Sequence, residues 1–410
     1  MLTSRRIIIK REDFLEKVVL FGLILTSMNF AQSFYYLLFF TFCLMFFQRK
    51  MLVVDRSFLW SILFTVSLLV FWQDATESML SLIRIFAFPV AYLFGYNYLS
   101  NRKEDDNGIE KQLLMLIVVI STGTFLHLML NFLINIDLNV GRNTIDIWTG
   151  KPLSATGQGA LACMMIGCSL GVLMSGITKV KYKLFSVLAI ILMFFYNMIL
   201  AGRTMIALTL VVYMLLLFNY LCHFKVSNKT IRMIFILLLV LVSISICYYL
   251  NVFGIRDMIL NSNLYNRFFG SSTMGVFEDS RSAIRMRYFE YMPLYFLGGG
   301  HIRHLTGNYA HDLYLNVYDE AGIFAFFAVL GLVVSYWVHV IQLLRHSDVS
   351  FKVKQIVLGV SIAINIMYLL EPIFLGMPWL IVWLCLLHGA IAHFNNILRK
   401  RRVYERSCLI

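Results

Sequence analysis

The sequence predicts an all-α, polytopic integral membrane protein. Of its 410 residues, 60% are hydrophobic and only 14% are charged, and the mean hydropathy is +0.77. Soluble domains average about 25% charged residues, so we expect most of this chain to contact lipid. Apolar runs of about 17–25 residues, each long enough to cross a bilayer as a helix, recur along the whole chain.

Twelve membrane-spanning helices are expected. Basic residues precede the first one, as in a signal peptide, but no small-residue cleavage site follows, so we interpret it as a retained helix. Asn29, Gln32 and Ser33 favour a hairpin between the first two spans, and one long tilted helix over residues 18–47 is the alternative. The expected spans are residues 14–30, 32–48, 57–73, 79–99, 112–136, 155–177, 184–200, 203–222, 233–252, 313–344, 355–375 and 379–398.

Lysine and arginine in the short connections predict the orientation of the chain. With the N-terminus inside, 25 of the 35 basic residues are cytoplasmic, nine lie outside and Arg84 falls within a span. Both termini are therefore expected in the cytoplasm. The chain divides into an N-terminal bundle of about nine spans (1–252), a large extracytoplasmic loop (253–312), and about three further spans with a basic tail (313–410). This distribution of charge favours a membrane over nucleic acid as the reason for the net charge of +13.

The basic residues expected outside are eight arginines and one lysine, Lys151, whereas the inner side has 13 lysines and 12 arginines. A loop that only needs to be soluble could use either cation. The bias therefore favours recognition of an oxyanion by the planar, bidentate guanidinium group.

Two outer segments are long, residues 137–154 and 253–312. The second has about sixty residues between apolar spans, far more than a common connection, which is typical of a functional cap or lid. It is rich in Tyr and Phe, as expected of helices at a membrane interface.

Within this loop, "DSRSAIRMR" (279–287) places Arg281 and Arg285 four residues apart. On a helix they share a face, where like charges are unfavourable by a few tenths of a kcal/mol. An anion held between them would reverse that sign, and Asp279 or Ser280 could cap the helix. The alternative is a solvated loop helix.

Arg203, in "LAGRTMIALTL", lies where the eighth span begins on the outer side. A helix N-terminus offers unpaired N–H groups and partial positive charge, and an arginine there strengthens an anion site. An interfacial arginine that extends its charge toward water is the alternative.

The segment "GGGHIRHLTGNYAHDLYLNVYDEAG" (298–322) begins with Gly298 to Gly300, which permit a tight turn against neighbouring backbone. His311 lies near the start of the helix that continues into the tenth span. A histidine there suits a base or a hydrogen-bonding group for a polar acceptor, although it could be a structural interfacial residue.

His301 and His304 could coordinate a metal together with His311 or Asp312. No E-x-x-H pattern or catalytic carboxylate accompanies them, so we expect neither a metal nor a cofactor. The seven cysteines are scattered and are interpreted as packing residues.

Polar residues expected in or near the bilayer are candidates for a functional role by default, but each could instead pair with another residue of the helix bundle. They are Arg84, His127, Glu371 and His388. The chain has no P-loop, Rossmann fingerprint or cytoplasmic D-x-D, so we expect a substrate activated by lipid linkage rather than by a nucleotide.

The combination of these features resembles the O-antigen ligase / Wzy-type polysaccharide polymerase superfamily. The resemblance covers the twelve spans, the late outer loop and "TGKPLSATGQGALA" (149–162), which is similar to the family's junction between its first long outer loop and the next helix. The matching residues are Arg203 in "AGRT", Arg281 to Arg287 ahead of Gly298 and Gly300, and His311, Asp312, Tyr314, Leu315, Glu320 and Gly322 in the pattern H-[ND]-x-[YF]-L…E-x-G.

This resemblance implies a GT-C-like membrane glycosyltransferase that polymerises oligosaccharide repeat units linked to undecaprenyl pyrophosphate, on the outer face of the bacterial plasma membrane. The product would be a capsular, O-antigen or exopolysaccharide. In the family, arginines grip the pyrophosphate and no metal is needed. The implied catalytic residues are His311, Arg203, Arg281 and Arg285, and the implied substrate-binding residues are Arg287, Arg303, Asp312, Tyr314, Asn316, Gly298 and Gly300.

The sequence departs from the family pattern at two points: Asp312 replaces the usual Asn, and no proline precedes G-x-G. Which of Arg281, Arg285 and Arg287 contacts pyrophosphate is open. The implied partners are the lipid-linked oligosaccharide as donor and acceptor, membrane lipids, a chain-length regulator and a flippase. Two other functions fit the sequence: a ligase of the same family, and a flippase for lipid-linked saccharides. A flippase would place its charges along a cavity within the spans.

Overall fold

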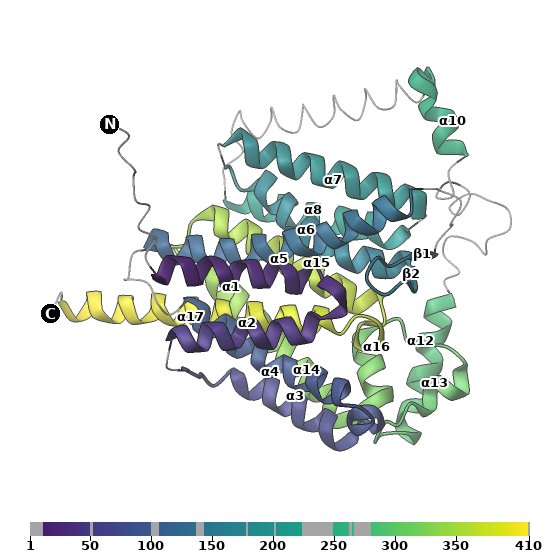
Figure 1. Ribbon diagram of the computed structural model, residues 1–410, viewed down its shortest axis with the longest axis horizontal. Helices are drawn as coiled ribbons and strands as arrows, with labels where there is room; N and C mark the ends of the chain where they lie inside the picture. The colour runs from purple at the N-terminus through teal and green to yellow at the C-terminus, as the bar shows by residue number, and fades with distance from the viewer. Residues whose placement is uncertain are drawn as a thin grey trace, which may run out of the picture. The chain divides into compact units, whose positions relative to one another are not determined.

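The computed structural model in Figure 1 describes residues 11–49, 52–99, 106–136, 143–177, 179–200, 202–223, 249–261, 265 and 280–408. Most of the expected ninth span (233–252) lies outside the described residues. The same is true of the connection near 225–232 and of Arg142, Arg267 and Asp279 in the outer segments.

The chain is mostly helical, as predicted. Within the described residues, eight helices are long and apolar enough to cross a membrane, and each corresponds to an expected span. This confirms the prediction of an all-α, membrane-embedded protein. They are α4 (Met79–Tyr98), α5 (Asp106–Ile134), α6 (Ala155–Met174), α7 (Val180–Leu200), α8 (Arg203–His223), α14 (Leu313–Arg345), α15 (Phe351–Leu370) and α17 (Trp379–Cys408).

Three shorter helices correspond to the first three expected spans: α1 (Arg11–Ser27), α2 (Phe34–Arg49) and α3 (Phe58–Phe71). Asn29, Ala31 and Gln32 have left-handed backbone conformations, with φ of 50°, 49° and 61°, and the short helix η1 (Phe30–Gln32) separates α1 from α2. The two helices pack side by side (Figure 1). The expected hairpin is therefore present, and the alternative of one long helix is wrong.

The chain folds into two compact units. The first comprises residues 1–127, 287–349 and 371–410, and the second comprises residues 128–286 and 350–370. The two units therefore alternate along the sequence.

Each unit has a core in which two helices approach backbone to backbone. In the first unit α4 packs on α17, where a Cβ added to Gly95 would lie 1.8 Å from the Leu386 carbonyl oxygen. In the second unit α6 packs on α15, where a Cβ added to Gly167 would lie 2.5 Å from the Gly359 carbonyl oxygen. Small residues permit such close approach in membrane helices.

The smaller elements lie at the ends of the helices. The hairpin of β1 (Asn143–Ile145) and β2 (Pro152–Ser154) is antiparallel and precedes α6. The described part of the large loop contains η5 (Val252–Gly254), α10 (Ile255–Leu260), α12 (Ser280–Tyr291), η6 (Met292–Leu294) and α13 (His301–Thr306). The remaining short helices are η2 (Gln73–Thr76) and α16 (Ile373–Gly376).

Candidate functional site

The two arginines predicted to share a face of α12 do share it, and both reach the last turn of α15. Arg281 Nη1 donates to the Leu370 carbonyl oxygen at 2.9 Å, and Arg285 Nη2 donates to the Leu369 carbonyl oxygen. A helix C-terminus carries unpaired carbonyl groups and partial negative charge, which attract cations. These contacts orient the two guanidinium groups on α12.

Tyr288 anchors the C-terminal half of α12 in the first unit. Its side chain is fully buried, and its hydroxyl donates to the Asn308 carbonyl oxygen at 2.9 Å. Burial raises the pKa of the Tyr288 hydroxyl, so the group remains a neutral hydrogen-bond donor. Arg287, one residue before it, is exposed.

The glycine run packs against the first part of α14, as the sequence predicted. Gly298, Gly299 and Gly300 have φ of 86°, 90° and 69°. The N–H groups of Gly299 and Gly300 donate to the carbonyl oxygens of Glu320 and Asp319, at 3.1 and 2.7 Å. A Cβ added to Gly298 would lie 2.5 Å from the Gly322 nitrogen, so no side chain is tolerated there without a backbone shift.

This packing explains a break inside α14. Gly322 has φ 76° and ψ −172°, a conformation that is essentially restricted to glycine. At the break, Ile323 N–H donates to the Phe296 carbonyl oxygen at 2.9 Å. The segment around the glycine run therefore supplies hydrogen bonds that an uninterrupted helix would have made within itself.

Two buried acids at the end of the first part of α14 hold α13. Asp319 accepts hydrogen bonds from the N–H groups of Ile302 and Arg303, at 2.9 and 3.1 Å, and so caps the start of that short helix. Glu320 forms an ion pair with Arg303, with 2.7 Å between Oε1 and Nη1. The Arg303 guanidinium also lies 5.3 Å from the centre of the Tyr309 ring.

His311 lies just before α14, as predicted, and faces a carboxyl group. Its Nδ1 is 3.8 Å from Oε2 of Glu371, whose side chain is fully buried, while the His311 side chain is 30% exposed. This distance is that of an ion pair and exceeds that of a hydrogen bond. Glu371 was one of several polar residues between which the sequence did not choose, and its pairing with His311 was missed because 60 residues separate them.

Asp312 is the N-cap of α14. Its carboxylate accepts hydrogen bonds from the N–H groups of Tyr314 and Leu315, at 2.8 and 3.1 Å. Asn and Asp cap helices about equally well, so either residue at this position would give the same local structure. Asn316, one turn further on, is buried and accepts a hydrogen bond from the Leu375 N–H at 3.2 Å.

Arg203 is the first residue of α8, as predicted, and belongs to the second unit. The turn before it is tight, because Gly202 N–H donates to the Asn197 carbonyl oxygen at 3.2 Å. A Cβ on Gly202 would lie 2.3 Å from Asn197 Oδ1.

A buried polar network in the second unit supports the segment around residues 149–162. The amide of Asn131 donates to Asp146 and Gln158, at 3.4 and 3.3 Å. Asp146 Oδ1 accepts from the N–H groups of Trp148 and Thr149. The network fastens the β-hairpin to α5 and α6, a structural role that sequence reasoning did not assign.

The other polar candidates expected in or near the bilayer lie in the first unit. The Arg84 guanidinium lies 5.9 Å from the Tyr35 ring centre, and His388 Nε2 lies 3.2 Å from the Ser335 hydroxyl. His127 is buried in α5. Among the residues that the structure describes, no three His, Cys, Asp or Glu side chains form a group that could hold a metal ion.

The predicted site residues are divided between the two units. Arg203, Arg281 and Arg285 belong to the second unit. The first unit contains Arg287, Gly298, Gly300, Arg303, His311, Asp312, Tyr314 and Asn316. No protein-family model and no curated protein matches the chain, so the resemblance seen in the sequence stays a prediction.

Proposed function

We propose that the protein is a glycosyltransferase with twelve spans and cytoplasmic termini, which polymerises oligosaccharide repeat units linked to undecaprenyl pyrophosphate on the outer face of a bacterial plasma membrane. The observation that carries the proposal is the pair of arginines on one face of α12, which both donate to carbonyl groups at the end of α15. Paired guanidinium groups match the geometry of a pyrophosphate and would counter its charge.

In the proposed reaction the pyrophosphate is the leaving group. The bond between the anomeric carbon and the phosphate oxygen breaks, and negative charge accumulates on the departing lipid pyrophosphate. Arg281, Arg285 and Arg203 stabilise that charge, and preorganised electrostatic assistance of this kind usually contributes most to catalysis. The arginines take the role that a divalent metal has in other phosphate chemistry.

His311 is the proposed base. Its Nδ1 faces Glu371, so Nε2 is the atom that would receive the proton of the acceptor hydroxyl. The acceptor oxygen then forms the new bond to the anomeric carbon, and the growing chain passes to the incoming repeat unit. General-base assistance typically contributes 10²–10⁴-fold. The buried Glu371 carboxyl supports the role because it would stabilise the imidazolium ion that forms.

The test is to replace Arg203, Arg281, Arg285 and His311 singly by alanine in the source bacterium and to measure the length distribution of the surface glycan. We expect long chains to be lost and single repeat units to accumulate. Arg256→Ala is the matched control, because Arg256 is an exposed loop arginine, 46% exposed and 3.8 Å from Asp257. Unchanged long chains in all four variants would refute the assignment. Long chains that accumulate on the carrier lipid would indicate the ligase instead.

A further inference from the structure

A run of exposed apolar side chains lies in the large loop, between α12 and α13. Leu294, Phe296 and Leu297 are 68%, 53% and 49% exposed. The stretch from Tyr291 to Gly300 includes no Asp, Glu, Lys or Arg. Exposing large apolar side chains to water is unfavourable, and a contiguous patch of them is typical of an interaction surface.

Hydrogen bonds fix this segment to α14 of the same unit. The Phe296 carbonyl oxygen accepts from the Ile323 N–H at 2.9 Å. The Met292 carbonyl oxygen accepts from the Tyr318 hydroxyl at 2.6 Å. The segment therefore lies beside residues 318–323, where the first part of α14 ends and the long apolar part begins.

The sequence of α14 places this level at the edge of the hydrocarbon core. About 20 residues of helix cross the core of a bilayer. Residues 321–344 include no Asp, Glu, Lys or Arg, and the helix ends at Arg345. Counting about 20 residues back from Arg345 reaches Ala325. Ile323 is two positions further, so the hydrogen bond from its N–H lies about 3 Å along the helix from that edge.

The exposed side chains of the loop adjoin a lipid-facing surface. Helix α14 is one of the candidate membrane spans, and Phe324 and Phe327 are both more than half exposed on it. In a bilayer these two side chains contact hydrocarbon. Phe324 directly follows Ile323, to which the loop is hydrogen-bonded. The apolar patch of the loop is therefore continuous with the membrane-facing side of α14.

The backbone of the segment is suited to contact with hydrocarbon. An irregular segment in that environment must satisfy its polar groups within the protein. Besides the two bonds to α14, the Met292 carbonyl oxygen accepts from the Tyr295 N–H at 3.3 Å, and the Tyr295 carbonyl oxygen accepts from the Gly298 N–H at 3.2 Å. The carbonyl groups of Met292, Tyr295 and Phe296 are thus hydrogen-bonded without water.

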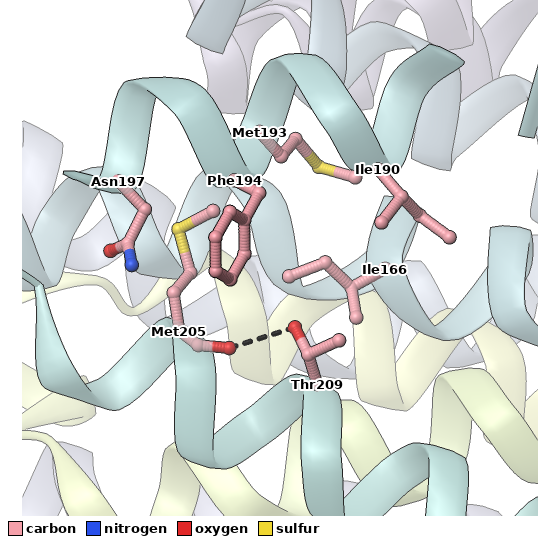
Figure 2. Close-up of a pocket in the computed structure, with 7 residues that line it drawn as sticks. All are labelled: Ile166, Ile190, Met193, Phe194, Asn197, Met205 and Thr209. Carbon is pink, nitrogen blue, oxygen red and sulfur yellow. Dashed lines mark hydrogen bonds between the residues drawn. The ribbon is translucent and has the colours of Figure 1, made fainter. Parts of the chain in front are cut away.

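An apolar pocket in the second unit differs from this surface. Figure 2 shows the pocket, which is lined by residues of α6, α7 and α8, among them Ile166 and Met205. It has room for about one water molecule, so a lipid chain does not fit. The side chains of residues 292–297 need no cavity, because a lipid can reach them from outside.

We propose that residues 292–297 are a membrane anchor outside the spans, whose Leu294, Phe296 and Leu297 side chains insert into the hydrocarbon of the adjacent leaflet. The absence of charge, the depth and the continuity with α14 favour lipid over a protein partner. In the proposed topology this leaflet is the outer one. The anchor keeps the glycine run and α13 at the membrane surface. The inference rests on the membrane-embedded fold and does not require the proposed transfer reaction.

The test introduces the photoreactive residue p-benzoylphenylalanine singly at position 294 or 296 of the full-length protein, in nanodiscs of phosphatidylcholine. Light attaches the benzophenone group to a nearby C–H bond, and mass spectrometry identifies the attached molecule and the part of it that reacted. We expect adducts with lipid acyl chains at both positions, as at Phe327, the positive control on α14. Asn308, an exposed polar residue of the same loop, is the matched control and should give no acyl-chain adduct.

The proposal is wrong if neither loop position forms an acyl-chain adduct while Phe327 does. Crosslinks between two copies of the chain would overturn it in favour of an interface between copies. Equal acyl-chain labelling at Asn308 would also contradict it, because exposure alone would then explain the adducts. Position 297 replaces 294 or 296 if either variant does not fold.

Discussion

In the proposed reaction, replacing Glu371 by Gln should slow glycosyl transfer while leaving the fold intact. The Glu371 carboxyl lies 3.8 Å from His311 Nδ1, and Gln has nearly the same shape without the charge. Two unit charges about 4 Å apart attract by about 4 kcal/mol at an effective dielectric constant near 20, and by about 1 kcal/mol in bulk water. The His311 side chain is 30% exposed, so the attraction that Glu371→Gln removes should fall between these limits. That corresponds to a reduction in rate between about fivefold and about a thousandfold.

The assay is the initial rate of polymer formation in membrane vesicles that contain the protein and the lipid-linked repeat unit of the proposed reaction. A double-mutant cycle with His311→Ala separates a positioning role from a general loss of structure. If Glu371 acts through the imidazole, Glu371→Gln should cost almost nothing further once His311 is alanine, and Glu371→Asp should restore part of the rate. If Glu371→Gln lowers the rate equally with His311 and with alanine at position 311, Glu371 does not act through the imidazole.

Three further predictions concern the fold around the site. Gly322→Ala should destabilise the protein by roughly 3 kcal/mol, because its backbone conformation is essentially restricted to glycine and its Cβ would lie 2.6 Å from a backbone carbon. Gly307 also has a positive φ, but a Cβ added to it would meet open space. Gly307→Ala should therefore lower the free energy of unfolding, measured in detergent, by only about 1 kcal/mol. Asp312→Ala should lower the free energy of unfolding by about 1 kcal/mol, because the cap of α14 is lost, and Asp312→Asn should lower it by only a few tenths. Equal losses in the two variants would contradict the capping role. Reporter fusions should place residues 253–312 outside and residues 225–232 inside, and a cytosolic loop would exclude the proposed reaction.

The helices could be predicted from the sequence because helix formation in a membrane depends on local composition. A run of about twenty apolar residues cannot leave its backbone unpaired in hydrocarbon, so it folds as a helix whatever its neighbours are. The hairpin turn at Asn29, Gln32 and Ser33 was also predicted, because polar side chains favour turns locally. A helix start near His311 was expected as well. The break at Gly322 was not predicted. It is caused by packing against the segment around Phe296, which is distant in the sequence and supplies the replacement hydrogen bonds.

The same distinction applies to the candidate site. The four-residue spacing of Arg281 and Arg285 is a local property, and the expected common face of α12 is observed. The ion pair of Arg303 with Glu320 and the approach of His311 to Glu371 join residues that are 17 and 60 positions apart. By charge alone, each of these residues could pair with several others in the sequence. Only the tertiary packing selects among them.

The ion pair of Arg303 bears on the substrate-binding role that the resemblance implies for it. Arg303 forms an ion pair with the nearly buried Glu320 at 2.7 Å, so its charge is already compensated within the fold. To contact a phosphate it would have to leave a carboxylate in a poorly solvated place, which is costly. Arg281 and Arg285 donate to carbonyl groups of α15, and a hydrogen bond from a guanidinium group to a phosphate oxygen is stronger than one to a carbonyl because both partners are charged. The pyrophosphate is therefore assigned to Arg281 and Arg285 in our proposal. Arg303 would hold α13 in place.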